Sequence, residues 1–187
     1  YIPTLCHFHP IDHKPGTCRV CLVEATDAEG NTSLVTSCCT PMQEGMKIDT
    51  LSRHVRRAQK LQVELVFADH DQNCVACARH GDCELQSLGE YVGLSTNRFS
   101  SRPVNDRPLD DTMRGMVRDM TKCIRCLRCV EVCRKVQGVA ALTVDGTGVD
   151  AHVGVGMAPS QNVSACIQCG QCTIVCPTGA LAERDQN

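Results

Sequence analysis

Cysteine provides most of the chemistry available to this chain. Sixteen of its 187 residues are cysteines, and fifteen of them fall, together with one histidine, into four consecutive groups. Cysteine at this density is typical either of a disulfide scaffold or of metal sites. Thiolate and imidazole ligands at short, repeated intervals favour metal sites, and above all iron–sulfur clusters.

The two C-terminal groups share one spacing, C-x2-C-x2-C-x3-C, which is the run that bacterial ferredoxins use. Disulfide frameworks do not repeat this run, and its recurrence 43 residues later indicates an internally duplicated two-cluster unit. In two-cluster ferredoxins the fourth cysteine of each run ligates the other cluster. Carried over to this chain, the rule predicts two [4Fe-4S] clusters, one on Cys123, Cys126, Cys129 and Cys176, the other on Cys133, Cys166, Cys169 and Cys172.

The first group has the spacing C-x11-C-x2-C-x16-C and consists of Cys6, Cys18, Cys21 and Cys38. Its C-x2-C core fits a plant-type [2Fe-2S] cluster, although the first gap is longer than the four residues of that type. On spacing alone a zinc site is the alternative. Cys38 and Cys39 are adjacent, so either could be the last ligand.

The second group mixes one imidazole with three thiolates: His70, Cys74, Cys77 and Cys83. It predicts a [4Fe-4S] cluster with one histidine ligand, and a Cys3His zinc knuckle is the alternative. His80 lies within the same loop and competes with His70 for the role of ligand.

The motifs around the first two groups resemble known redox proteins. Residues 1–6 and 17–24 resemble the N-terminal ferredoxin domain of the complex I large subunit. In that family a Cys-x-x-Pro motif precedes a Gly-Met pair, and residues 38–46 fit it best with Cys38 as the ligand and Cys39 as a spare. Residues 69–86 resemble the His-ligated cluster segment of complex I and [FeFe]-hydrogenase relatives, which implies His70 as the ligand.

The order of the modules resembles the electron-input half of [FeFe]-hydrogenase catalytic subunits of the NAD(P)-linked type. Residues 128–139 and 169–185 look like the hydrogenase version of the two-cluster unit. The resemblance implies an oxidoreductase segment that passes electrons between a flavin- or NAD(P)-linked iron–sulfur partner subunit and an H-cluster domain, C-terminal to the segment or in another chain. NAD-dependent formate dehydrogenases share the same order and remain an alternative. A non-redox zinc scaffold is a third interpretation.

Composition argues against several other functions. The formal net charge is −2, and thiolates with four cluster cores would add about −7, which disfavours nucleic-acid binding. Aromatic residues make up 3% of the chain, so base-stacking platforms are not expected. We find no nucleotide motif, catalytic constellation, signal peptide or long apolar segment, and therefore expect no catalytic residues, no membrane span and a cytoplasmic protein. A start at Tyr1 indicates a fragment or a processed form.

The elements that must position the ligands are small, and the fold class we expect is α+β. Residues 1–49 should form a partial plant-type ferredoxin (β-grasp) domain that is incomplete at its N-terminus, with strands near 20–23 and 34–36. Residues 50–94 should form a small helical His/Cys3 [4Fe-4S] domain, with helices over 50–69 and 84–94. The pattern predicts a linker over residues 95–118 and the two-[4Fe-4S] ferredoxin-like domain over residues 119–187.

Overall fold

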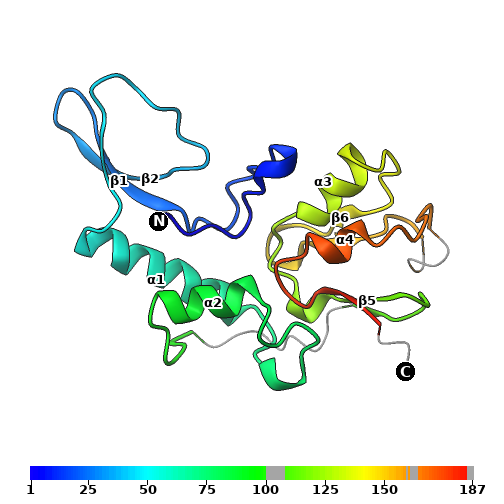
Figure 1. The fold of residues 1–187 in the computed structure, drawn as a ribbon. Helices are drawn as coiled ribbons and strands as arrows, with labels where there is room; N and C mark the ends of the chain where they lie inside the picture. Colours follow the sequence, from blue (N-terminus) through cyan, green and yellow to red (C-terminus); the bar gives the residue numbers. More distant parts are fainter. Residues whose placement is uncertain (100–107, 159, 161–163, 185–187) are drawn as a thin grey trace.

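The computed structural model describes residues 1–99, 108–158, 160 and 164–184. Short helices and small antiparallel sheets make up both halves of the chain, as the predicted α+β class requires. Figure 1 shows the N-terminal half, blue to green, beside the C-terminal half, yellow to red. The segment that carries the first turn of 3-10 helix, η1 (His9–Ile11), reaches across from the first half to the second. Three further 3-10 turns are η2 (Cys74–Ala76), η4 (Met120–Lys122) and η5 (Gly148–Asp150).

The first sheet has the strand order β2-β1-β3. Its central strand β1 (Leu22–Thr26) pairs antiparallel with β2 (Thr32–Thr36) and with β3 (Lys47–Asp49). The β1–β2 turn is closed by Asp27, whose side chain accepts a hydrogen bond of 2.7 Å from the backbone of Asn31. The strand expected at 20–23 begins at Leu22, because Arg19 adopts a left-handed conformation (φ 52°) and keeps residues 18–21 in a loop.

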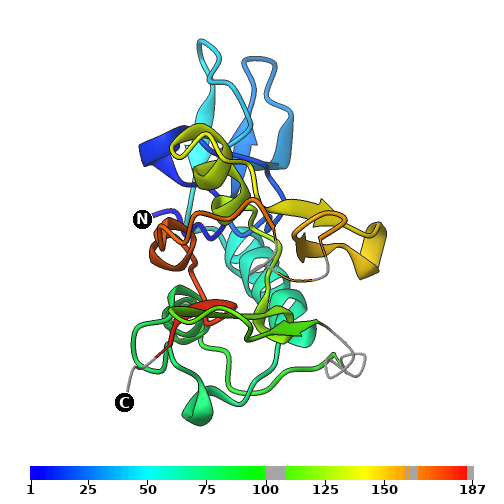
Figure 2. The same cartoon turned by 90° about the vertical axis from the view of Figure 1, so that its right-hand side faces the viewer.

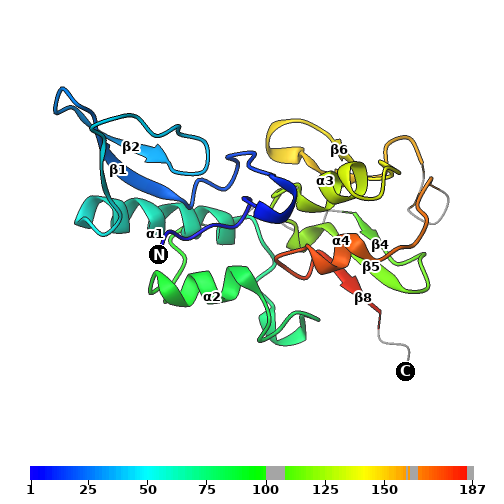
Figure 3. The same cartoon turned by 45° about the horizontal axis from the view of Figure 1, so that its top comes forward.

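Helix α1 (Arg53–Ala68) lies under this sheet, and Figure 3 shows β1 and β2 above it with α2 below. The side chain of Ser52 caps the helix by accepting a hydrogen bond of 3.1 Å from the backbone of Val55. Val55 and Val63 are fully buried, and burial of each contributes about 1.5–3 kcal/mol. Gln59 Nε2 donates to the carbonyl of Leu22 at 2.9 Å, which fixes the helix on β1.

The buried face of α1 differs from the face that the apolar periodicity suggests. Leu51 and Leu65 are 57% and 44% exposed, because the contact with β1 is centred on Val55, Gln59 and Val63. The expected basic face is exposed at Arg53, Arg56 and Arg57. The second helix, α2 (Glu84–Tyr91), packs on α1 through Gly89, where a Cβ atom would lie 3.0 Å from the ring of Phe67.

The second half is built on a sheet of order β4-β5-β8. Its central strand β5 (Met116–Asp119) lies between β4 (Leu109–Asp110) and β8 (Leu181–Glu183), and β8 is seen in red beside β5 in Figure 2. A second, two-stranded sheet pairs β6 (Thr143–Asp145) with β7 (His152–Gly154). Two short helices, α3 (Arg128–Lys135) and α4 (Gln171–Ile174), complete this half.

The segment expected to be a linker differs in part from that expectation. Residues 100–107 lie outside the described residues, but β4 and β5 occupy much of 109–118 and join the second half. The side chain of Arg118 is buried there and donates to the carbonyl of Val153 at 3.0 Å and to Asp110 at 3.2 Å. Strands of two and four residues are too short to show an alternating pattern in the sequence.

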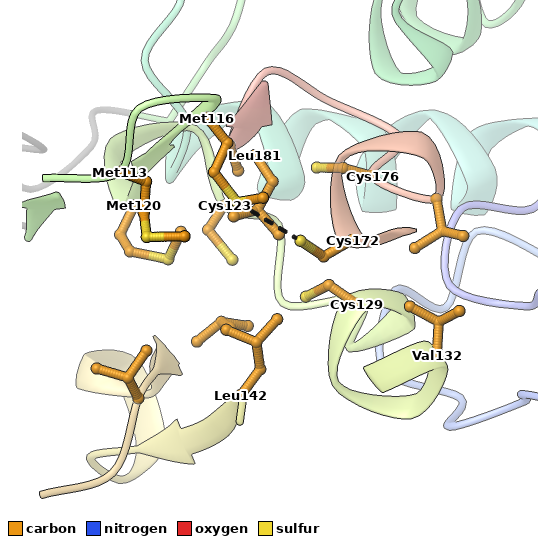
Figure 4. Packing of buried hydrophobic residues seen from close by; sticks show 14 residues of the cluster. Met113, Met116, Met120, Cys123, Cys129, Val132, Leu142, Cys172, Cys176 and Leu181 are labelled. Atoms are coloured by element: carbon orange, nitrogen blue, oxygen red, sulfur yellow. Dashed lines mark hydrogen bonds between the residues drawn. The ribbon is translucent and has the colours of Figure 1, made fainter. Parts of the chain in front are cut away.

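Two buried clusters form the core. The C-terminal cluster combines cysteines with Met113, Met116 and Met120, and Figure 4 shows these methionines across from Cys129 and Cys172. The N-terminal cluster contains Leu5, Val20, Val63, Leu85 and Leu88, and it also contains Cys126 of the second half. The two halves therefore share a core at a residue predicted to bind a cluster.

Candidate metal centres

Four cysteines line one cavity in the second half: Cys123, Cys126, Cys129 and Cys176. Three come from the loop that leads into α3, and the fourth follows α4, so the set is the one that the ferredoxin rule predicts. We call this space cavity A. All four are buried, and burial raises the pKa of Cys123, Cys126 and Cys129. Thiolates in such surroundings need a cation beside them, and iron would supply it.

The other predicted set lines a second cavity, which we call cavity B. Its cysteines are Cys133, Cys166, Cys169 and Cys172. Burial raises the pKa of Cys172 to about 12, whereas Cys169 is exposed. The Cys172 sulfur lies 3.9 Å from Met116 Sδ, the contact that is dashed in Figure 4.

The two cysteine loops have the same backbone shape. Arg125 and Leu127 adopt left-handed conformations (φ 56° and 62°), and the residues 43 positions later, Gln168 and Gly170, do so too (φ 59° and 74°). Left-handed residues at alternate positions curl the chain, so that successive cysteines face the same space. The duplication seen in the sequence thus recurs as a duplicated loop.

The first group lies in the N-terminal half as two pairs. Cys6 and Cys18 hydrogen-bond one another, which lowers the pKa of Cys6 to about 5. The sulfurs of Cys21 and Cys38 lie 3.4 Å apart. The structure therefore brings the four predicted residues into two close pairs.

Cys39 is placed differently from its neighbour. It is exposed, and its sulfur contacts the carbonyl of Lys14 at 3.5 Å. A separation of 3.5 Å still joins it to Cys38 Sγ. Gly16 makes room for it, because a Cβ at this position would lie 2.9 Å from the Cys39 sulfur.

The second group follows the end of α1. His70 is buried, its Nδ1 atom has no hydrogen-bond partner, and burial lowers its pKa to about 4. A neutral imidazole with an unpartnered, buried nitrogen fits a metal ligand. His80, the competing residue in the loop, is exposed.

The three cysteines of this group lie on η2 and before α2, against the loop that follows Cys176. Cys83 Sγ approaches the carbonyl of Pro177 at 3.7 Å. A Cβ atom at Gly179 would lie 2.5 Å from Cys77 Sγ. Within the described ranges, no three His, Cys, Asp or Glu side chains form a group that could hold a single metal ion.

Cavity A is the meeting point of the groups. Cys126 shares the N-terminal core with Cys6 and Cys18, and Cys18 and Cys123 line one groove of about 350 Å³. On its other side, the Pro177–Gly179 loop carries the second group's contacts.

Two residues at this junction were not predicted as functional. His13, which we expected only to flank the first group, is buried and bonds the carbonyl of Cys126 at 2.8 Å through Nε2. Arg128 is buried and pairs with Glu84. Neither has a signal in the sequence beyond its position beside a cysteine motif.

Comparison with known families assigns each segment. Residues 1–53 match a 2Fe-2S iron-sulfur cluster binding domain, residues 59–98 the NADH-ubiquinone oxidoreductase-G iron-sulfur binding region, and residues 122–180 a 4Fe-4S dicluster domain. The chain is an iron–sulfur region of the NADH-quinone oxidoreductase G type. The predicted presence of both [2Fe-2S] and [4Fe-4S] domains is confirmed at this level.

Several oxidoreductase subunits are similar to this G-type region along its whole length. The NADP-reducing hydrogenase subunit HndD of Solidesulfovibrio fructosivorans is 37% identical over 98% of the chain and 32% of its own length. An NADH-quinone oxidoreductase subunit of the same G type, from Rhizobium meliloti, is 32% identical over 96% of the chain and 20% of its own length. The chain thus spans a third or less of these relatives.

A solved structure shares the fold. In the crystal structure of an NAD+-reducing [NiFe]-hydrogenase in its H2-reduced state, one chain matches with a TM-score of 0.88 at 28% identity, covering 100% of this chain and 77% of that one. Among the helices of the described residues, none has the length and apolarity needed to cross a membrane.

Proposed function

We propose that the chain is the iron–sulfur electron relay of an NAD(P)-linked oxidoreductase. The observation that carries the proposal is the lining of cavities A and B, each by four cysteines that come from both duplicated runs. Such sharing is the ligand pattern of two-cluster ferredoxins. Clusters bound at these cysteines supply reversible one-electron transfer.

The ligand sets that we propose follow the four groups. Cavity A binds one [4Fe-4S] cluster through Cys123, Cys126, Cys129 and Cys176, and cavity B binds another through Cys133, Cys166, Cys169 and Cys172. A third [4Fe-4S] cluster is held by His70, Cys74, Cys77 and Cys83. The [2Fe-2S] cluster is held by Cys6, Cys18, Cys21 and Cys38, whose arrangement as two pairs suits two irons with two thiolates each.

The route through the relay runs through cavity A. Its cysteines contact the first group through Cys126 and Cys18 and the second group through the loop after Cys176. Cavity B adjoins it across α3 and α4, whose cysteines lie in one buried cluster. We therefore infer that electrons entering at either N-terminal site converge on cavity A and continue to cavity B.

The partners that we propose are a flavin- or NAD(P)-linked iron–sulfur subunit and a hydrogenase catalytic domain. The relative with 37% identity is an NADP-reducing hydrogenase subunit, and the solved structure belongs to an NAD+-reducing hydrogenase. The sequence motifs of the two-cluster unit favour the [FeFe] type with its H-cluster. The relatives named as NADH-quinone or NADH-ubiquinone oxidoreductase subunits support a complex I-type assembly as the second candidate.

The decisive experiment is anaerobic purification followed by iron, zinc and acid-labile sulfide analysis. We expect about 14 iron and 14 sulfide per chain, the sum for one two-iron and three four-iron clusters. Colourless protein that contains zinc and no sulfide would contradict the relay and favour a zinc scaffold. In the intact complex, reduction of the clusters by NAD(P)H or H2, followed by electron paramagnetic resonance, tests the partner assignment.

A further inference from the structure

Arg128 occupies the junction of three cysteine groups with its charge buried. Its side chain is 5% exposed. The guanidinium donates to both carboxylate oxygens of Glu84, at 2.7 and 2.8 Å, and to the carbonyl of His7 at 3.4 Å. The ring of Phe8 lies 5.1 Å from its central carbon, so an aromatic face covers the cation.

The partners of Arg128 belong to three different ligand segments. Glu84 directly follows Cys83, and His7 directly follows Cys6. Arg128 itself directly precedes Cys129 at the start of α3. One side chain therefore fastens the segments of the first and second groups to the rim of cavity A.

The geometry suits arginine rather than lysine. The planar guanidinium forms a two-bond fork with a carboxylate and has further donors for a third acceptor, whereas an ammonium is a point charge. A buried cation also needs partners to offset its desolvation. Glu84 supplies one, but its side chain is 47% exposed, so water screens the carboxylate more than the cation.

We propose that Arg128 is a positioning residue that joins the Cys6 and Cys83 segments to cavity A, and that its buried cation raises the reduction potential of the cluster bound there. Reduction adds a negative charge to a cluster, and a nearby positive charge in a low-dielectric site favours the reduced form. This inference rests on the proposed function, because it requires that cavity A hold a redox cluster.

The test compares three variants of the cluster-loaded protein by redox titration monitored by electron paramagnetic resonance. We expect Arg128→Met to shift the potential of one [4Fe-4S] cluster to more negative values. Glu84→Gln should shift the same cluster to more positive values, because the cation stays and its counter-charge is lost. Arg128→Lys should keep the potential near that of the unmodified protein but lower the melting temperature, because the fork is lost.

Opposite shifts separate an electrostatic role from general damage, since a loosened fold would not reverse its effect with the sign of the charge removed. Arg57→Met, which removes an exposed arginine of α1, is the matched control and should leave all potentials unchanged. Unchanged potentials in Arg128→Met and Glu84→Gln, or shifts of the same sign, would overturn the inference while leaving the relay intact. If Arg128→Met loses its iron, the Glu84→Gln and Arg128→Lys results decide by the same criteria. An unmodified protein without clusters would instead refute the proposed function.

Discussion

Adjacent residues of identical type have different surroundings at Cys38 and Cys39. Cys38 lies 3.4 Å from Cys21 Sγ and is partly buried, whereas Cys39 is exposed beside the carbonyl of Lys14. We expect Cys38→Ala to lose the [2Fe-2S] cluster and Cys39→Ala to keep it, with two fewer irons per chain in the first variant only. Retention in Cys38→Ala combined with loss in Cys39→Ala would reverse the ligand assignment.

The histidine ligand carries its own prediction. His70 is buried and neutral, so it places one negative charge fewer at its cluster than a thiolate would. We expect His70→Cys to lower the reduction potential of this cluster by an amount on the order of 100 mV, since histidine in place of cysteine raises potentials in two-iron centres. A redox titration measures the shift, and an unchanged or raised potential would refute the charge argument. His80→Cys, at the exposed histidine of the same loop, is the control.

At the scale of elements, the loop after α4 connects two candidate centres. Gly179 approaches Cys77 so closely that a Cβ would lie 2.5 Å from its sulfur. We expect Gly179→Ala to push the second group away, at a cost of about 1–3 kcal/mol, and to weaken or remove the signal of the His-ligated cluster. Iron content and electron paramagnetic resonance check this outcome.

A control for this variant is available on the same chain. Gly30 has no atom within 4 Å of an added Cβ, although its φ of 89° makes a side chain strained there. Gly30→Ala should therefore cost stability in the β1–β2 turn without changing the clusters. Normal cluster signals in Gly179→Ala would show that the loop yields to the added methyl group.

The cysteine spacing predicted the site better than the periodicity predicted the elements. Ligand spacing depends on local loop geometry, and the curled loops around Arg125 and Gln168 follow directly from it. The buried face of α1 depends on which strand it meets, so Leu51 is exposed despite its place in the apolar pattern. Arg128 and Glu84 are 44 positions apart, and no local rule indicates that they pair.

For the molecule as a whole, much of the core consists of ligand residues. The buried clusters contain Cys6, Cys18, Cys123, Cys126, Cys129, Cys172 and Cys176, and the chain has only 3% aromatic residues to replace them. Without metal these thiols offer few of the contacts that stabilise an ordinary core. Binding of the clusters should therefore supply much of the folding free energy.

Removal of iron tests this dependence. We expect chelation under reducing conditions to lower the melting temperature by more than about 10 °C and to broaden the transition. Circular dichroism follows the unfolding, and reconstitution with iron and sulfide should restore it. A melting temperature that is the same with and without iron would show that the apolar residues suffice.

Cavity A has a consequence for how the protein is made. Its lining joins Cys123, Cys126 and Cys129 to Cys176, so the site has no complete set of thiols until translation has passed residue 176. The first two groups are fully synthesised by residue 83. Ribosomal synthesis therefore imposes a sequence of maturation, in which the junction of the relay is the last place able to receive its inorganic core.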